Sequence, residues 1–432
     1  MLGQFGLDLN SLGHLTIGGV DTIALSAQYG TPLFVINERQ LRNRCREYVE
    51  AMSTLFLNGR AAYACKAFCC KEMCRIADAE GMSLDVVSLG ELHTALSAGF
   101  PPHRMILHGS NKSTEELATA VKAGIGRIVV DGFWELERLA ELTEGLSTHV
   151  GILLRIRPDV AAHTHHAVET GREDSKFGFS LVAGEALEAV ALATRMTGVR
   201  LFGLHCHIGS QISECAPYEL AVNRMVQLLA KIKRRFGVEL PELNLGGGLA
   251  IRYAFTQKEP PAIGEYLSRI SIALKEACGQ YNVSCPSVTV EPGRSIVGPC
   301  GITLYTVGAI KRVESGRTYI SVDGGMADNP RYALYQSQYE AVTANRAGEP
   351  RSQRVSLAGR CCESGDLLGE EMPLQSAKAG EIIAVLATGA YNFSMASNYN
   401  RLPRPSVVMT SDGHARLVVR RQTIDDLIAN DL

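Results

Sequence analysis

RAAYACKAFCCKEMCRIADAEGMSLDVVSLGELHTALSAG (residues 60–99) alternates twice between a short apolar run and an amphipathic segment. The runs AAYACKA and SLDVVS have the length and the apolar content of buried strands. The segments KEMCRIADAEG and GELHTALSAG carry apolar residues three and four apart and stop at glycine, as helices do. This order of elements predicts parallel strands that are joined by crossover helices.

The same alternation continues to about residue 295. Six more strand-like runs follow, namely RMILHG, RIVVD, VGILLRI, LFGLHCHIG, LNLGGG and SVTVEPGR. Amphipathic segments separate them, and QLRNRCREYVEAMSTL (40–55) precedes the first strand as an eighth helix. Eight strands and eight helices in about 260 residues predict a (β/α)8 TIM barrel. An open doubly wound sheet is the alternative, but it usually has fewer strands and a G-x-G-x-x-G first turn, which ACKAFC is not.

The pattern of the chain changes after about residue 300. Strand-length alternating runs broken by turn residues dominate there, and helical signals are limited to NPRYALYQ and TIDDLIAND. This predicts a separate all-β domain, a sandwich or barrel. We expect GTPLFVIN (30–37) to join it, because chain ends often close into one domain. The expected domains are an N-terminal segment of the β domain (1–37), the barrel (38–298) and the C-terminal β domain (299–432).

Bulk composition describes an ordinary folded protein. Of the 432 residues, 46% are hydrophobic and 20% charged, and the formal net charge is −2, so no basic field exists to attract nucleic acid or anionic lipid. The N-terminus lacks a basic region followed by an apolar stretch, and no apolar run is long enough to span a bilayer. We therefore expect a cytoplasmic protein with neither nucleic-acid nor membrane partners.

The chain has 12 cysteines. They are scattered, many of them within apolar runs, which fits a reducing compartment and small packing roles. Cys70 and Cys74, with the adjacent Cys69, could suggest a metal, but no second pair with a matching histidine cluster follows. The sequence therefore predicts no metal site.

Lys66 interrupts the apolar run of the first predicted strand. In one interpretation it ends the strand and its amine reaches water. In the other, the amine loses its proton and acts as a nucleophile toward a carbonyl. Catalytic groups of such barrels collect at the C-terminal ends of the strands, which is where Lys66 would lie.

Other strand ends also carry polar residues and glycines. Gly246–Gly248 could bind a phosphate through backbone N–H groups or could simply form a tight turn. Glu291 and Arg294 of EPGR could enter one cavity or form a surface ion pair. His207 could stack on a flat ring, although a lone histidine is more often a core residue. Their shared location predicts a site.

An amine, an anion cradle, a carboxylate and a flat-ring neighbour fit one cofactor, pyridoxal 5'-phosphate. Lys66 would bond to its aldehyde, and Glu291 would keep the pyridine nitrogen protonated. A protonated ring withdraws electrons from the carbanion that forms when a bond to Cα breaks.

At this point the sequence resembles the barrel-type (fold-type III) pyridoxal-phosphate decarboxylases, over about residues 30 to 428. Within this family it looks most similar to the diaminopimelate branch, alongside the ornithine and arginine branches. The motifs that carry the resemblance are YACKA, DVVSLGEL, RIRPDVAAHTHHAVETGREDSKFGF, HCHIGSQ, LNLGGGLAI, EPGRSIVG, DNPRYALY, CCESGD and GAYNFSMASNYNRLPRP. It implies a β domain like that of alanine racemase. It also implies a carboxy-lyase that converts meso-2,6-diaminopimelate to L-lysine and carbon dioxide, the last step of lysine biosynthesis.

The resemblance also implies residue roles. The cofactor would be held by Lys66, His207, Gly247, Gly248, Glu291, Gly293, Arg294 and Tyr391. The substrate would be held by Arg294, Arg331, Tyr335, Glu363 and Tyr391. Lys66, His207 and Cys362 would be catalytic, with Cys362 as proton donor. Cys362 and Glu363 would reach the neighbouring subunit's site, which implies a homodimer with shared active sites.

The sequence departs from the family pattern at two places and leaves three alternatives. Phe68 stands where a polar residue is frequent, and Tyr332 where a proline is usual. The substrate could instead be ornithine, lysine, arginine or a carrier-bound amino acid. An alanine racemase would normally carry an arginine in place of Glu291. A passive cofactor carrier would lack the residues after 300 altogether.

Overall fold

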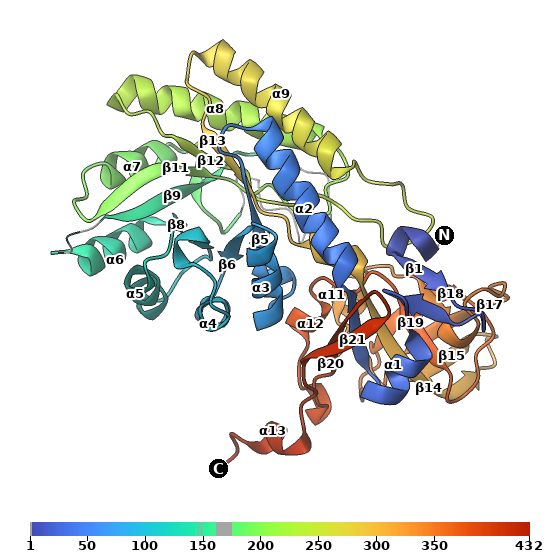
Figure 1. Cartoon of the computed structure of the whole chain (residues 1–432). Coiled ribbons are helices and arrows are strands. Elements are labelled where there is room, and N and C mark those ends of the chain that lie inside the picture. Colours follow the sequence, from blue (N-terminus) through green and yellow to red (C-terminus); the bar gives the residue numbers. More distant parts are fainter. Residues whose placement is uncertain (1, 146, 148, 161–174) are drawn as a thin grey trace. The chain divides into compact units, whose positions relative to one another are not determined.

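The computed structural model describes residues 2–145, 147, 149–160 and 175–432. The chain forms two compact units (Figure 1). The barrel unit comprises Arg44–Ala250 and Glu259–Ser295, and the β unit comprises Met1–Asn43, Ile251–Lys258 and Ile296–Leu432. No helix of the described residues has the length and apolar character that crossing a membrane requires.

Eight parallel strands close into a barrel, which confirms the predicted fold class. Their hydrogen-bonded order is β5-β6-β7-β8-β9-β11-β12-β13, and β13 pairs with β5. The bounds are β5 (Arg60–Ala64), β6 (Ser83–Val86), β7 (Met105–Leu107), β8 (Arg127–Val130), β9 (Val150–Arg157), β11 (Val199–His205), β12 (Glu242–Asn244) and β13 (Ser287–Val290). The two-residue strand β10 (Phe179–Ser180) extends the sheet beside β9.

Helices follow the barrel strands and lie outside them (Figure 1). They are α2 (Glu38–Leu55), which precedes β5, α3 (Lys71–Ala79), α4 (Leu89–Ser97), α5 (Thr114–Ala123), α6 (Phe133–Thr143), α7 (Glu185–Ala193), α8 (Ala216–Phe236), α9 (Ile263–Tyr281) and the short α10 (Arg294–Val297). Local sequence explains their ends. Helix α5, for example, begins with a reciprocal capping box between Ser113 and Glu116 and ends at Gly124, whose φ is +70°.

The β unit is built on a second sheet with the order β18-β17-β15-β14-β4-β20-β21. Strand β4 (Leu33–Asn37) lies between β14 and β20. The other strands are β14 (Gly301–Arg312), β15 (Thr318–Val322), β16 (Ala341–Thr343), β17 (Gln353–Ala358), β18 (Leu367–Leu374), β19 (Ile382–Val385), β20 (Ser406–Ser411) and β21 (His414–Val419). Its helices are α1 (Thr22–Tyr29), α11 (Arg331–Tyr335), α12 (Asn392–Met395) and α13 (Ile424–Ile428).

A few elements differ from the sequence prediction. The first barrel strand ends at Ala64, and Lys66 lies in a 3-10 turn, η2 (Cys65–Ala67). A small sheet of β1 (Leu7–Leu9), β2 (Leu15–Ile17) and β3 (Val20–Asp21) had no counterpart in the prediction. Most of HTHHAVETGREDS (163–175), which carries part of the family resemblance, lies outside the described residues.

Candidate functional site

Lys66 is positioned by the turn that follows the first barrel strand. The Tyr63 hydroxyl donates to the Phe68 carbonyl (2.9 Å) and closes this turn. The Ala64 N–H donates to the Pro292 carbonyl (3.0 Å), so the strand end is tied to the EPGR segment after β13. Lys66 therefore lies at the C-terminal end of its strand, where the sequence predicted it. Phe68, the first departure from the family pattern, is buried in the barrel unit.

Glu291 is a buried carboxylate surrounded by nitrogen atoms. Its Oε1 lies 2.6 Å from Nε2 of His108 and accepts a hydrogen bond from Nδ2 of Asn244 (2.6 Å). Its Oε2 lies 3.3 Å from Nε2 of His205. Burial by itself would raise the pKa of Glu291, but His108 and His205 together outweigh this and hold the pKa well below its ordinary value. Glu291 is therefore ionised at neutral pH and can stabilise a protonated nitrogen beside it.

His207 is neutral and has a defined tautomer. Burial, followed by the charge of Lys66, lowers the pKa of His207 well below its ordinary value. The Gly247 N–H donates to Nδ1 of His207 (3.2 Å), so the ring proton is on Nε2. A neutral imidazole with a fixed orientation is suited to lie against a flat ring rather than to act as a cation.

The glycines after β12 are required by close backbone packing. A Cβ on Gly246 would lie 2.7 Å from the Cys206 carbonyl oxygen, and one on Gly247 would overlap the Glu291 carbonyl oxygen. Gly248, with φ +117°, could not carry a Cβ without meeting the Gly209 carbonyl. The turn interpretation of this motif is thus sufficient to explain it, and phosphate binding remains a prediction.

Two further predicted residues flank this turn. A Cβ on Gly293 would lie 3.0 Å from the Cβ atoms of Ala64 and Ala67, so glycine at this position lets EPGR pack closely against the lysine turn. Arg294 is buried, and its Nη2 donates to Ser210 Oγ (2.9 Å). Its guanidinium is thereby held next to the HCHIGSQ segment, with donors suited to an anion.

Asp85, at the end of β6, supplies an unsatisfied acceptor. Its Oδ1 is buried and has no hydrogen-bond partner among the described residues. Burial raises the pKa of Asp85, and Nε2 of His108 is 3.8 Å from the same oxygen. A buried polar atom without a partner is costly, and such atoms concentrate where a ligand binds.

In the β unit, Arg331 and two tyrosines form a cluster. The guanidinium carbon of Arg331 lies 5.2 Å from the Tyr335 ring centroid and 5.3 Å from the Tyr391 ring centroid. Arg331 is buried, and its Nε has no hydrogen-bond partner among the described residues. Such a guanidinium can bind a carboxylate. Tyr332, the second departure from the family pattern, donates to Glu370 (2.9 Å).

Cys362 and Glu363 lie on an exposed loop of the β unit. Asp366 organises this loop, because its Oδ2 accepts from the Cys361 N–H (2.6 Å). The Cys362 N–H donates to Asn400 Oδ1 (2.7 Å). Burial and Asp366 raise the pKa of the half-buried Cys361 to about 11. Of the two adjacent thiols, Cys362 is the more exposed.

The structure brings the predicted barrel residues together and adds three partners of Glu291 that sequence reasoning missed. His108, His205 and Asn244 all contact Glu291, yet none of them was predicted as a site residue. All three lie at or just after the C-terminal ends of barrel strands, so the rule that identified Lys66 and His207 could have identified them too.

Comparison with known proteins agrees with this geometry. Residues 38–298 match the family model described as pyridoxal-dependent decarboxylase, pyridoxal binding domain. A curated relative from Bacillus subtilis, named diaminopimelate decarboxylase, is 47% identical over 98% of this chain and 96% of its own length. The chain belongs to the diaminopimelate decarboxylase family. A second member of the family, from Mycobacterium tuberculosis, is 42% identical over 97% of this chain and 95% of its own length.

Solved structures give the same result for this decarboxylase. Diaminopimelate decarboxylase from m. jannaschii in complex with L-lysine superposes with a TM-score of 0.91 and 32% identity, covering 100% of this chain and 99% of that one. A lysine/ornithine decarboxylase from Vibrio vulnificus has a TM-score of 0.75 at 24% identity over 90% of this chain and 97% of that one, which shows the shared fold.

Proposed function

We propose that this decarboxylase removes carbon dioxide from meso-2,6-diaminopimelate to give L-lysine, with pyridoxal 5'-phosphate as cofactor. The observation that supports it most is Glu291, a buried carboxylate kept ionised by nitrogen partners beside the lysine turn. A racemase of the same fold normally has an arginine in its place, as noted above. The substrate follows from the near full-length similarity to curated diaminopimelate decarboxylases.

The barrel residues fit the cofactor. Asp85 has a buried oxygen to satisfy, and Glu291 is an anion placed to pair with a protonated ring nitrogen. Lys66 would bond to the aldehyde and His207 would lie against the ring. Gly247, Gly248, Gly293 and Arg294, together with Tyr391, would hold the phosphate. When bound, the cofactor supplies an electron sink for the carbanion formed as carbon dioxide leaves.

The β-unit residues would select the substrate. Arg331, Tyr335 and Tyr391 would bind a carboxylate of the amino-acid end that does not react, since the Arg331 Nε lacks a partner among the described residues. Glu363 would bind the ammonium group of the same end, which makes the charges complementary to a second amino-acid terminus. Arg294 would contact both cofactor and substrate. A simple diamine-forming enzyme has no such terminus to recognise.

Cys362 would deliver the proton that replaces the carboxyl group at Cα. Its exposure, and that of Glu363, fits a homodimer in which this loop completes the neighbouring subunit's site. The adjacent Cys361 is a poorer candidate because burial and Asp366 raise its pKa and because it is less exposed than Cys362.

One assay tests the proposal. Purified protein loaded with pyridoxal 5'-phosphate is incubated with meso-diaminopimelate, ornithine, lysine and arginine in parallel, and products are separated by chromatography. We expect lysine and carbon dioxide from meso-diaminopimelate and little turnover of the others. A diamine as the main product would contradict the substrate assignment. Deuterium uptake at Cα without loss of carbon dioxide would instead indicate a racemase.

A further inference from the structure

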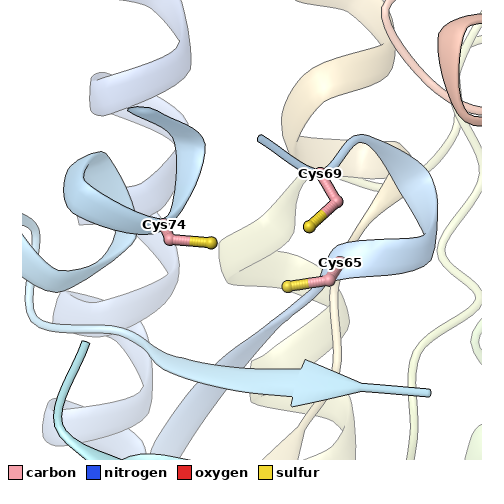
Figure 2. Close-up of side chains that lie close together, drawn as sticks. All are labelled: Cys65, Cys69 and Cys74. Atoms are coloured by element: carbon pink, nitrogen blue, oxygen red, sulfur yellow. The ribbon is translucent and has the colours of Figure 1, made fainter. Parts of the chain in front are cut away.

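Three cysteine side chains converge beside the lysine turn. Cys65 begins η2, Cys69 follows it, and Cys74 lies in the first half of α3, and Figure 2 shows their sulfur atoms directed toward one another. The three Sγ atoms all lie within 4.8 Å of one another. Cys65 and Cys74 are buried, whereas Cys69 is half-buried and gives access from solvent. The sequence spacing suggests Cys70 and Cys74 as a pair, but Cys70 caps α3, and its sulfur accepts a hydrogen bond from the Met73 N–H.

Packing alone would account for one or two of these thiols, because buried cysteine behaves as a small apolar side chain. Three sulfurs in mutual contact are also a ligand set. The nine-residue helix α3 directs its N-terminal end, with its partial positive charge, toward this region and favours a thiolate.

The sulfur spacing suits a single ion. A metal–thiolate bond of about 2.3 Å places three sulfurs roughly 4 Å apart around a common centre. Sulfurs that already lie within 4.8 Å need to approach by less than about 1 Å to reach this arrangement. Side-chain rotation at the half-buried Cys69 can supply such a movement.

Charge and ligand number select the kind of ion. Structural zinc takes four ligands, and among the described residues this group contains three. Three thiolates around a monovalent or divalent ion would leave a net negative charge in a largely buried position, which is unfavourable. Around a trivalent ion they form a neutral complex.

We propose that Cys65, Cys69 and Cys74 form a binding site for a soft trivalent ion held by three thiolates, with arsenite as the representative ligand. Arsenous acid reacts with three thiols, so that three arsenic–sulfur bonds form, three arsenic–oxygen bonds break and three waters leave, without any change of oxidation state. The bound ion would cross-link the turn that carries Lys66 to helix α3. The site does not depend on the proposed function.

Native mass spectrometry of the holoenzyme with arsenite tests the site, because the adduct mass counts the bonds formed. Three bonds add one arsenic, remove three hydrogens and retain no oxygen. The adjacent Cys361 and Cys362 can offer two bonds, and their adduct would retain one hydroxyl group. We expect an oxygen-free adduct at one equivalent per chain, and mapping by alkylation should show Cys65, Cys69 and Cys74 protected.

Matched variants complete the test. Cys69→Ser, at the half-buried position, should lose the oxygen-free adduct, whereas Cys70→Ser should retain it, because serine also caps a helix. Unchanged circular dichroism without arsenite checks that both variants fold. The proposal is overturned if wild type gives only adducts that retain oxygen, if Cys69→Ser retains the oxygen-free adduct, or if alkylation of the three cysteines in wild type is not slowed.

Discussion

Replacing His108 by alanine is expected to shift the acid limb of the pH–rate profile while leaving activity near pH 8 largely intact. His108 Nε2 lies 2.6 Å from Glu291 Oε1 and is one cause of the low pKa of that carboxyl. An interaction with a charged group contributes about 1.5–3 kcal/mol. At about 1.4 kcal/mol per pKa unit, its loss raises the pKa of Glu291 by roughly one to two units.

The starting value makes this shift visible only in acid. The pKa of Glu291 lies well below its ordinary value, so after the rise Glu291 is still ionised at pH 8. The assay is kcat and kcat/KM for lysine formation from about pH 3 to pH 9 with the cofactor saturating, because the wild-type limb lies below the ordinary carboxyl pKa of about 4.3. If Glu291 must be ionised for turnover, the acid limb should move upward by roughly one to two pH units. The shift should be seen in kcat/KM, which reports the free enzyme, and in kcat, which reports the substrate complex.

His108→Gln is the matched control, because the glutamine amide can still donate to Glu291. It should restore most of the acid limb. A uniform fall of activity at every pH, with the limb unmoved, would show that His108 acts through packing alone and would refute the positioning role.

The Glu291 carboxyl also predicts a pH dependence of folding stability. Because the pKa of Glu291 is lowered on folding, its contribution is present above the unfolded value of about 4.3 and is lost as pH falls through the folded pKa. The stability difference between wild type and His108→Ala should therefore shrink in acid.

Other substitutions test the remaining assignments. Lys66→Ala should abolish the visible absorption band of the lysine-bound cofactor, and a retained band would mean that another lysine holds it. Cys362→Ala should keep this band and slow turnover by roughly 10²–10⁴-fold, whereas Cys361→Ala should have little effect; equal losses would exclude Cys362 as the sole proton donor. Mixed dimers of Lys66→Ala and Cys362→Ala chains should regain part of the activity, and the absence of any rescue would argue against shared sites. Gly247→Ala should destabilise the chain by about 1–3 kcal/mol or more in denaturant unfolding, since its Cβ meets the Glu291 carbonyl; unchanged stability would contradict the close packing.

The strength of periodic patterns explains which elements could be predicted. The eight barrel strands were identified because each is a buried run between helices with clear three- and four-residue spacing. Strands β1, β2, β3 and β16 have only two or three residues each. The barrel strands β7 and β12 are equally short, but each stands between two amphipathic helices that mark its place, whereas the four short strands of the β unit do not. Strand β18 carries two consecutive glutamates, which obscure its alternation. The 3-10 turn at Lys66 was read as strand because its neighbours are apolar on both sides.

The site residues could likewise be predicted only where their position along a strand determines their place in the fold. Strand-end position identified Lys66, His207 and Glu291, since the fold itself brings these ends together. The partners of Glu291 depend on which side chains turn inward from three other strands, and sequence spacing does not encode that. The cysteines illustrate the point further. The spacing of Cys70 and Cys74 suggested a pair, yet the turn after β5 directs Cys65 and Cys69 toward Cys74 instead.

In the barrel unit, the apolar cluster that stabilises the interior is separate from the polar residues of the candidate site. Ala62, Ile106, Val129 and Leu153 form a buried apolar cluster. Because β5, β7 and β9 are not neighbours in the sheet, side chains from these strands can meet only across the barrel interior. Nearer the strand ends, the barrel unit also buries charged and polar side chains, namely Asp85, His108, His205, Asn244 and Glu291, where an interior chosen for stability alone would place apolar residues.

The buried polar side chains at the strand ends therefore destabilise the fold, and the apolar cluster offsets this cost. Their hydrogen bonds indicate that they are arranged to bind a ligand. Glu291 has nitrogen partners on both oxygens before any ligand arrives. Asp85, by contrast, keeps a buried oxygen without a hydrogen-bond partner among the described residues. A site whose central anion is already stabilised, and whose neighbouring carboxyl still needs a donor, is organised in advance to bind a cationic, hydrogen-bond-donating ring. Burying the Asp85 oxygen without a donor makes the unliganded fold less stable. A hydrogen bond from the ligand to this oxygen would offset that cost and favour binding.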